Sequence, residues 1–243
     1  MKVGWSMNYS YLDCLAALGV GGAHPGGLKL TKERLAQEKL DESIKILDAG
    51  CGTGQTSAYL AKEYGCDITA LDQNKVMVEK ANERFLSEKI EVKAVEGSIE
   101  ELPFADNSFD LVLSESVMLF TDIAKSISEC KRVLKPRGKL LAMEMVVKDN
   151  VDEEELVTLK DFYQEAHFHA EKKWKQTFKK AGFKTVHTEK PEVQFDPNDV
   201  DTVPEYSLSE SVDPTYFEIM QAHEEMLKSY NNVLSFCVFR CTK

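Results

Sequence analysis

Between about residues 44 and 147, short apolar runs alternate with segments of helical spacing. The apolar runs span 44–49, 67–72, 89–95, 109–114 and 139–147, and the helical segments span 56–64, 75–87 and 123–134. A short apolar run closed by glycines is typical of a strand that is buried on both faces in a parallel sheet. Parallel strands need crossover connections, which are almost always right-handed. The alternation therefore predicts an α/β fold with a doubly wound sheet.

The chain beyond residue 147 has a different pattern. Residues 152–181 have the spacing of one long helix that ends at Gly182, and residues 191–214, rich in Pro, Asp and Ser, have the composition of a loop. The remaining segments predict a strand over 183–189, a helix over 215–230 and a final strand over 233–241.

These segments divide the chain into a main domain and its additions. Residues 1–39 are expected to form an N-terminal helical lid, and residues 40–243 a single large domain. Within that domain, cap elements are expected at about 150–180 and 191–230, because neither stretch continues the regular alternation of the sheet.

Charge and hydropathy limit the partners of the chain. Its 243 residues carry a formal net charge of −11, and an acidic surface repels phosphate backbones. No apolar run approaches the roughly 20 residues that a membrane span requires, and residues 14–20 lack the basic flank of a signal peptide. The six cysteines show neither a CxxC pair nor a metal-ligand spacing. We expect a cytoplasmic protein with free thiols, no metal, no nucleic-acid partner and no integral membrane contact.

A glycine-rich turn follows the first apolar run, where residues 48–54 read Asp-Ala-Gly-Cys-Gly-Thr-Gly. Glycines lack a Cβ, so the backbone can turn sharply and lie in contact with a ligand. Free amides at the start of the next helix would face that ligand with partial positive charge. Asp72 ends the second apolar run, 72 − 54 = 18 residues after the last glycine, near the spacing at which an acidic residue binds ribose hydroxyls. The pattern predicts a nucleoside pocket at the carboxyl edge of the sheet.

Residues 46–54, Ile-Leu-Asp-Ala-Gly-Cys-Gly-Thr-Gly, match the signature of class I S-adenosylmethionine-dependent methyltransferases. Three later stretches, 97–110, 132–138 and 181–183, resemble further motifs of that family in the same order. The chain thus resembles the family over roughly residues 40–190, most closely its small-molecule members such as the quinone-biosynthesis methyltransferases. The resemblance implies a seven-stranded, mostly parallel sheet of order 3-2-1-4-5-7-6 with strand 7 antiparallel.

The resemblance also implies S-adenosylmethionine as the cofactor and assigns residues to it. The glycine turn would face the methionine end of the cofactor through Asp48, Gly50, Cys51, Gly52, Thr53 and Gly54. Asp72 would hold the ribose hydroxyls, and Gln73 would flank the adenine. Ser98 and Ile99 would line the adenine face, with Ser98 standing where the family commonly has Asp.

Few catalytic residues are needed for such chemistry, because a sulfonium methyl is already a strong electrophile. Positioning alone can lower the barrier by about 7–11 kcal/mol. The resemblance places Ser114 and Glu115, at the end of the fourth strand, beside the methionine and the transferred methyl. His24 and Glu115 are the candidate proton acceptors, and His24 lies in the glycine-rich segment 21–27, which suits a lid over the pocket. Alternatively, His24 caps a helix.

Three further titratable residues are also candidate bases. Glu144 lies near the end of the fifth strand, where it either acts on a substrate or pairs with a neighbouring lysine. His167 and His169 are expected on a helix, where residues i and i+2 do not share a face. We therefore expect no metal pair there, and surface or packing roles for both.

Aromatic side chains are frequent in the segments outside the predicted sheet. They are Trp5, Tyr9, Tyr11, Phe162, Tyr163, Phe168, Trp174, Tyr206, Tyr216 and Phe217. One interpretation is a cap whose rings line an apolar acceptor pocket; the other is a cap with a small core of its own. We expect most rings in the core and a few, near Tyr11 or Phe162, in the pocket lining.

The function most favoured is in-line methyl transfer to a small-molecule acceptor, and two alternatives stay open. One is a protein that binds the cofactor without catalysis. The other is a nicotinamide-dependent oxidoreductase, which the spacing G-x-G-x-G disfavours because the nicotinamide fingerprint is G-x-G-x-x-G. The sequence identifies neither the acceptor nor the oligomeric state, for which a homodimer is one possibility.

Overall fold

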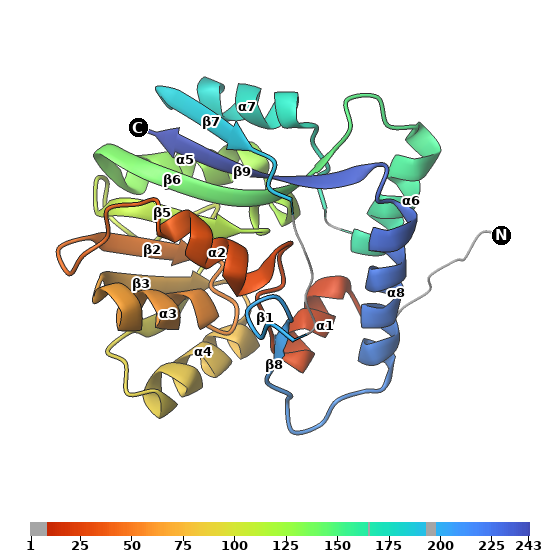
Figure 1. The fold of residues 1–243 in the computed structure, drawn as a ribbon, viewed down its shortest axis with the longest axis horizontal. Coiled ribbons are helices and arrows are strands. Elements are labelled where there is room, and N and C mark those ends of the chain that lie inside the picture. Colours follow the sequence, from red (N-terminus) through yellow and green to blue (C-terminus); the bar gives the residue numbers. More distant parts are fainter. Residues whose placement is uncertain (1–8, 165, 193–197) are drawn as a thin grey trace.

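The computed structural model describes residues 9–164, 166–192 and 198–243, and its centre is a seven-stranded sheet with helices on both faces (Figure 1). From one edge to the other, the strands are β4 (Lys93–Glu96), β3 (Asp67–Asp72), β2 (Lys45–Ala49), β5 (Phe109–Glu115), β6 (Leu134–Val147), β9 (Leu234–Thr242) and β7 (Thr185–Glu189). All neighbouring strands are parallel except β9, which runs antiparallel to β6 and β7. Counted along the chain, this is the order 3-2-1-4-5-7-6, so the predicted doubly wound sheet is confirmed.

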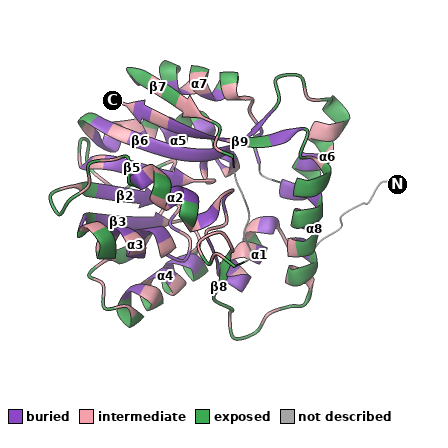
Figure 2. Cartoon of the chain, viewed as in Figure 1, coloured by how far each residue is buried: buried purple, intermediate pink, exposed green. Residues whose placement is uncertain are grey.

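Helices cover the two faces because successive strand residues point to opposite sides. One face carries α2 (Gly27–Leu35), α3 (Gln55–Tyr64) and α4 (Lys75–Ser87), and the other carries α5 (Ile123–Val133) and α7 (Glu171–Lys180). Ile46 of β2 packs in one cluster with Leu60, while its neighbour Leu47 packs in the other cluster with Ile127. Figure 2 shows the result: the central strands are largely buried, and the outward faces of the helices are exposed.

Several helices begin at side chains that cap them. Asn74 accepts hydrogen bonds from the first amides of α4, and Asp122 does the same for α5. At the N-terminal end of the chain, Ser10 and Asp13 form a capping box on α1 (Tyr11–Leu18). None of the helices among the described residues combines the length and the apolarity that crossing a membrane requires.

The single helix predicted over 152–181 is wrong. The segment forms two helices, α6 (Glu153–Tyr163) and α7, joined by a connection in which residues 166–170 are not helical. Here backbone groups bond to the 3₁₀ turn after β5 and to the sheet: the amide of His167 donates to the carbonyl of Leu119 at 2.6 Å, and the amide of Val147 in β6 donates to the carbonyl of His169 at 3.2 Å. His167 and His169 therefore lie in this connection and not on a helix.

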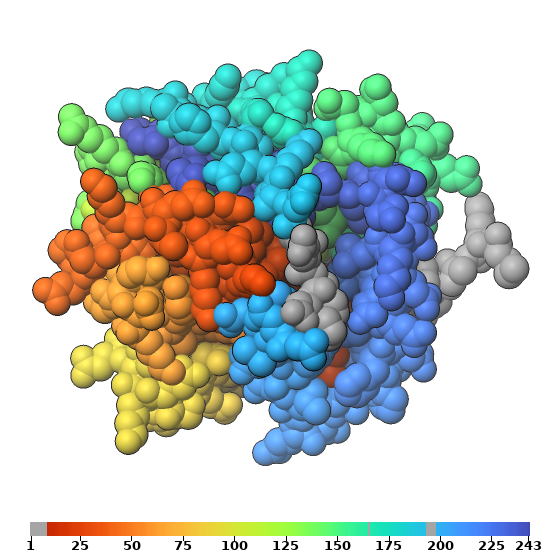
Figure 3. All heavy atoms as spheres, viewed as in Figure 1, coloured from red at the N-terminus to blue at the C-terminus, as the bar shows by residue number. Residues whose placement is uncertain are grey.

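Two segments far apart in the sequence lie together over the carboxyl ends of the strands. We call residues 10–35 the N-terminal segment and residues 198–209 the covering loop. Their two-residue strands, β1 (Val20–Gly21) and β8 (Glu205–Tyr206), pair antiparallel. In the space-filling view the two segments are in contact, and helix α8 (Thr215–Ser229) stands beyond the covering loop (Figure 3). The predicted loop over 191–214 thus contains a strand, and residues 1–8 of the predicted lid lie outside the described residues.

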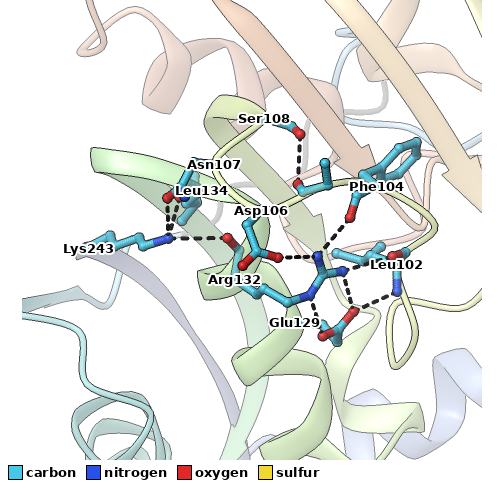
Figure 4. A network of polar contacts seen from close by, with 10 residues as sticks. Leu102, Phe104, Asp106, Asn107, Ser108, Glu129, Arg132, Leu134 and Lys243 are labelled. Carbon is cyan, nitrogen blue, oxygen red and sulfur yellow. Dashed lines mark hydrogen bonds and ion pairs between the residues drawn. The ribbon is translucent and has the colours of Figure 1, made fainter.

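A network around Arg132 fixes the connection between β4 and β5 (Figure 4). The guanidinium donates to the carbonyls of Leu102 and Phe104 and to the carboxylates of Asp106 and Glu129. All these contacts are at the amino-terminal side of β5. The network therefore ties α5 to the connection that carries Ser98 and Ile99.

Candidate active site

The carboxyl ends of β2, β3 and β5 open onto a cavity of about 1460 Å³. Gly52, Asp72 and Glu115, each at or just after the end of one of these strands, line it, and the N-terminal segment, the covering loop and α8 complete the lining. Ligands in open α/β sheets bind at this edge, where the strand order reverses. A pocket for one drug-sized ligand typically measures about 300–1,000 Å³, so this cavity has room for two small molecules.

The three glycines of the turn are required for different reasons. All have a positive φ: 88° at Gly50, 52° at Gly52 and 74° at Gly54. A Cβ at Gly50 would lie 2.2 Å from Cγ2 of Val117, and a Cβ at Gly54 would lie 2.6 Å from Cζ of Phe85. At Gly52 no described atom lies within 4 Å of the Cβ position. Packing therefore dictates the first and third glycines, whereas the space over Gly52 is open on the cavity side.

Asp72 holds the glycine turn from the end of β3. Its Oδ2 accepts the amide of Gly52 at 2.9 Å, and its Oδ1 accepts the amide of Asn74 at 2.8 Å. Burial raises the pKa of this carboxyl, and the backbone donors oppose that shift. A carboxylate offers about four lone-pair sites, so these backbone donors leave capacity for a ligand in the cavity that Asp72 lines.

Asp48 lies beneath the turn and does not line the cavity. Its Oδ2 accepts the hydroxyl of Ser57 at 2.6 Å, which ties β2 to α3. Burial raises the pKa of Asp48 to about 7, and the nearby negative charge of Glu115 adds to the shift. A cation in the cavity would favour the ionised form of Asp48 and lower that pKa.

Glu115 joins the N-terminal segment to the sheet. Its Oε1 accepts the hydroxyl of Thr31 at 2.5 Å, and its Oε2 accepts the hydroxyl of Thr56 at 2.7 Å. The Nε2 atom of His24 lies 3.4 Å from Oε1 of Glu115 and 3.2 Å from Oγ1 of Thr31. The structure therefore brings together the two candidate proton acceptors, His24 and Glu115, and both line the cavity.

Glu144 is fully buried behind this edge and pairs with no lysine among the described residues. Its carboxyl oxygens accept the amides of Met118 at 3.1 Å and Leu119 at 3.3 Å, the first residues of a 3₁₀ turn after β5. Ser114 donates its hydroxyl to Oε1 of Glu144 at 3.4 Å. Burial raises the pKa of Glu144 to about 8, against these donors. Its observed role is to hold the chain that follows Glu115.

Two hydroxyl groups at the cavity make no hydrogen bond with any described residue. They are Oγ1 of Thr53 and Oγ of Ser116, both buried atoms of residues that line the cavity. Ser116 also has a φ of 58°, an uncommon conformation for a residue other than glycine. Buried hydroxyls are normally paired, so these two are suited to bind a polar ligand.

The other residues predicted for the cofactor divide into two groups. Cys51, Gln73 and Ile99 line the cavity. Ser98 and Ser114 are outside its lining: Ser98 accepts the amide of Glu100 at 3.1 Å, and Ser114 bonds to Glu144 as described above.

Aromatic side chains line the part of the cavity away from the glycine turn, which we call the aromatic half. Tyr11, Tyr163 and His223 line it, whereas Phe162 is packed in the core. Trp5 lies outside the described residues. Most of the other predicted cap aromatics join the same core: Phe168 and Trp174 are buried, and Tyr9 and Tyr216 pack against it. Tyr206 and Phe217 are exposed, and Tyr206 lines the cavity.

Many residues of the cavity and its hydrogen-bond network are not among those that the sequence predicts, and four of them recur in the account below. They are Thr31, Thr56, Ser116 and His223. The sequence could have predicted Thr56, because it lies in the first helical turn after the glycines. The other three could not be predicted from a local pattern, because only the folded chain brings them to the site.

The fold and the site together define a class I S-adenosylmethionine-dependent methyltransferase. A family model described as a methyltransferase domain matches residues 47–142, and the chain belongs to this family. It is 37% identical to the uncharacterized methyltransferase YodH of Bacillus subtilis (strain 168), over 94% of this chain and 97% of that protein.

Two solved structures share the fold. One is phosphoethanolamine N-methyltransferase 2 of Haemonchus contortus in complex with S-adenosyl-L-methionine, with a TM-score of 0.73 and 20% identity over 98% of this chain and 58% of that chain. The other is a putative sarcosine dimethylglycine methyltransferase from Galdieria sulphuraria, with a TM-score of 0.71 and 21% identity over 88% and 83%.

Proposed function

We propose that the cavity binds S-adenosylmethionine over the glycine turn and that the cofactor's methyl group passes to a small molecule held in the aromatic half. The observation that carries this proposal is the open space at Gly52, which a Cβ would enter without meeting any described atom. The unpaired hydroxyls of Thr53 and Ser116 border the same cavity. A polar ligand that fits tightly against the backbone would fill that space and satisfy both groups.

The residues present fit the parts of this cofactor. Asp72 has hydrogen-bonding capacity left for the ribose hydroxyls. Gln73 and Ile99, which follow β3 and β4, would contact the adenine, and the backbone of Gly50–Thr53 the methionine end. Asp48, Gly54, Ser98 and Ser114 would act indirectly, because they support the cavity and do not line it.

The cofactor supplies an electrophilic methyl group, and the protein must orient the acceptor and exclude water. The N-terminal segment and the covering loop are suited to the second task. Lys29 and Lys32 form ion pairs with Asp199 and Asp201 across them. His24 and Glu115 are the proposed proton acceptors, since both line the cavity and lie within 3.4 Å of each other.

Calorimetry with S-adenosylmethionine and S-adenosylhomocysteine tests the proposal. Gly52→Ala should weaken binding of both by about 30-fold or more, equivalent to about 2 kcal/mol, because the methyl group occupies the ligand's space. Gly65→Ala is the matched control: Gly65 has a similar φ of 66°, and the nearest atom to its Cβ position is 3.9 Å away, but it does not line the cavity. Absence of binding to the wild-type protein, or equal weakening by both substitutions, would contradict the proposal.

Location and assembly stay predictions. A cytoplasmic location accords with six free, buried cysteines. Light scattering coupled to size exclusion separates the monomer from the predicted alternative, a homodimer.

A further inference from the structure

We propose that His223, held by Tyr163, is the group that hydrogen-bonds the methyl acceptor, and that the acceptor has an uncharged apolar body with a hydroxyl or carbonyl oxygen. This inference rests on the proposed function, because it assigns the acceptor to the aromatic half of the cavity.

The first support is the position of His223 on α8. Met220, His223 and Leu227 all line the cavity, and their spacing of three and four residues places them on one face of the helix. His223 is the polar member of this row. It thus stands between two apolar side chains on a wall that faces the acceptor half.

The second support is the way in which the imidazole is held. Tyr163 Oη lies 2.9 Å from Nδ1 of His223. The ring of Tyr11 stacks on the imidazole, with centroids 4.7 Å apart and planes at 27°, and the ring of Tyr163 meets it edge-on at 5.8 Å. Contacts from two separate elements, α1 and α6, therefore fix the orientation of His223.

The third support is the other ring nitrogen. Nε2 of His223 makes no hydrogen bond with a described residue, and it is not among the buried polar atoms that lack a partner. The Nε2 atom is therefore accessible, and His223 lines the cavity.

Burial raises the pKa of Tyr163 above its ordinary value and lowers the pKa of His223 to about 4, so both groups are neutral at pH 7. We infer that Tyr163 donates to Nδ1, which leaves the proton on Nε2 to donate to an oxygen of the acceptor.

The surroundings set the chemistry of the acceptor. Tyr11, Leu15, Phe120, Met145 and Leu234 line this half with apolar surface. The charged side chains near it are Asp13, Glu224 and Lys228, all exposed, and the last two pair with each other at 3.6 Å. An acceptor that carries a charge next to His223 would lose its hydration without gaining a counter-ion.

Phenol and toluene serve as probes, because phenol carries the hydroxyl group that His223 would bind and toluene carries a methyl group of similar size in its place. Their dissociation constants are measured by NMR titration of the wild-type protein, His223→Phe and, as the matched control, His187→Phe, which changes an exposed histidine of β7 outside the cavity. We expect His223→Phe to weaken phenol binding about fivefold to tenfold and to leave toluene within about twofold, as the loss of one neutral hydrogen bond requires. We expect no change with His187→Phe.

The role of Tyr163 is tested by a separate measurement. In Tyr163→Phe the ¹⁵N shifts of the His223 ring should show a changed ratio of the two tautomers, and phenol binding should weaken about twofold to threefold because the ring is less well fixed. If His223→Phe unfolds because Tyr163 loses its partner, the double variant Tyr163→Phe/His223→Phe removes both polar groups and gives the same comparison.

Three results would overturn the inference: no saturable phenol binding to the wild-type protein, equal losses for phenol and toluene, or an unchanged tautomer ratio in Tyr163→Phe. These titrations need no cofactor. Failure of the proposed function would appear separately, as a lack of S-adenosylhomocysteine binding in calorimetry.

Discussion

The two halves of the cavity are built in opposite ways. In the sheet half, backbone conformation makes the site: a turn with three positive φ values, held by Asp72, leaves a space over Gly52. In the cap half, side chains from α1, α6 and α8 make the site, and Tyr163 and His223 come from different helices.

This difference separates donor binding from acceptor choice. The glycine turn depends on a few residues that are close in the sequence. Its structure can therefore be kept while residues of the cap half are substituted. A wall of side chains can be altered one residue at a time. Substitutions in the sheet half should therefore affect folding and cofactor binding, and substitutions in the cap half should affect the acceptor.

The largest effect on the free energy of unfolding is expected within the glycine turn. Gly54→Ala should lower the free energy of unfolding by about 3 kcal/mol, because its Cβ would overlap Phe85 and the residue would keep an unfavourable φ. Gly52→Ala should cost only about 1 kcal/mol, from the φ alone. Urea unfolding measures both, and equal costs would show that the space over Gly52 is not open.

The sequence predicted the sheet half because its determinants are local. Residues 46–54 contain the strand, the turn and the three glycines, and Asp72 follows at a recognisable distance. The cap half depends on contacts between residues that are far apart in the sequence, such as Tyr163 with His223 and Tyr11 with His223. No local pattern encodes these contacts. The break between α6 and α7 was missed for the same reason, since those residues bond to the sheet and the loop after β5.

The buried carboxyl groups of the sheet half predict a pH dependence. The pKa of Glu144 rises from 4.5 to about 8 on folding, so between these values the native state holds a proton that the unfolded state has lost. Stability should therefore fall as pH rises from about 5 to about 8, and Asp48 should add a loss in the same direction up to its pKa of about 7.

The variant Glu144→Gln should flatten the upper part of that profile, whereas Glu101→Gln, at an exposed site, should leave it unchanged. Thermal unfolding from pH 5 to pH 9 is the measurement. A stability that rises over this range in the wild-type protein would contradict the burial of a neutral Glu144.

A substitution at the junction between the two halves should change the free energy of unfolding by a smaller amount. Thr31→Val removes a hydroxyl donor from Glu115 and should lower the free energy of unfolding by about 1.5 kcal/mol, with roughly tenfold faster hydrogen exchange in α2. Thr158→Val on α6, whose hydroxyl bonds only to its own helix, is the control. Unchanged exchange in α2 would mean that Glu115 does not hold the N-terminal segment.

The smallest effect is expected at the surface. Lys32→Ala removes an ion pair with Asp201 and a contact with the ring of Tyr59. It should cost less than about 1 kcal/mol, because ion pairs that are only partly buried near the surface contribute little. The difference in melting temperature from the wild-type protein should shrink in 1 M NaCl, and a salt-independent loss would show that packing dominates this contact.

A crystal structure with S-adenosylhomocysteine tests the division of the cavity most directly. We expect the adenosine beside Asp72 and Ile99, the homocysteine over Gly52 with a hydrogen bond to Thr53 or Ser116, and the sulfur directed toward the half that His223 lines. A ligand seated among Tyr11, Tyr163 and His223, with the space over Gly52 left empty, would contradict the account.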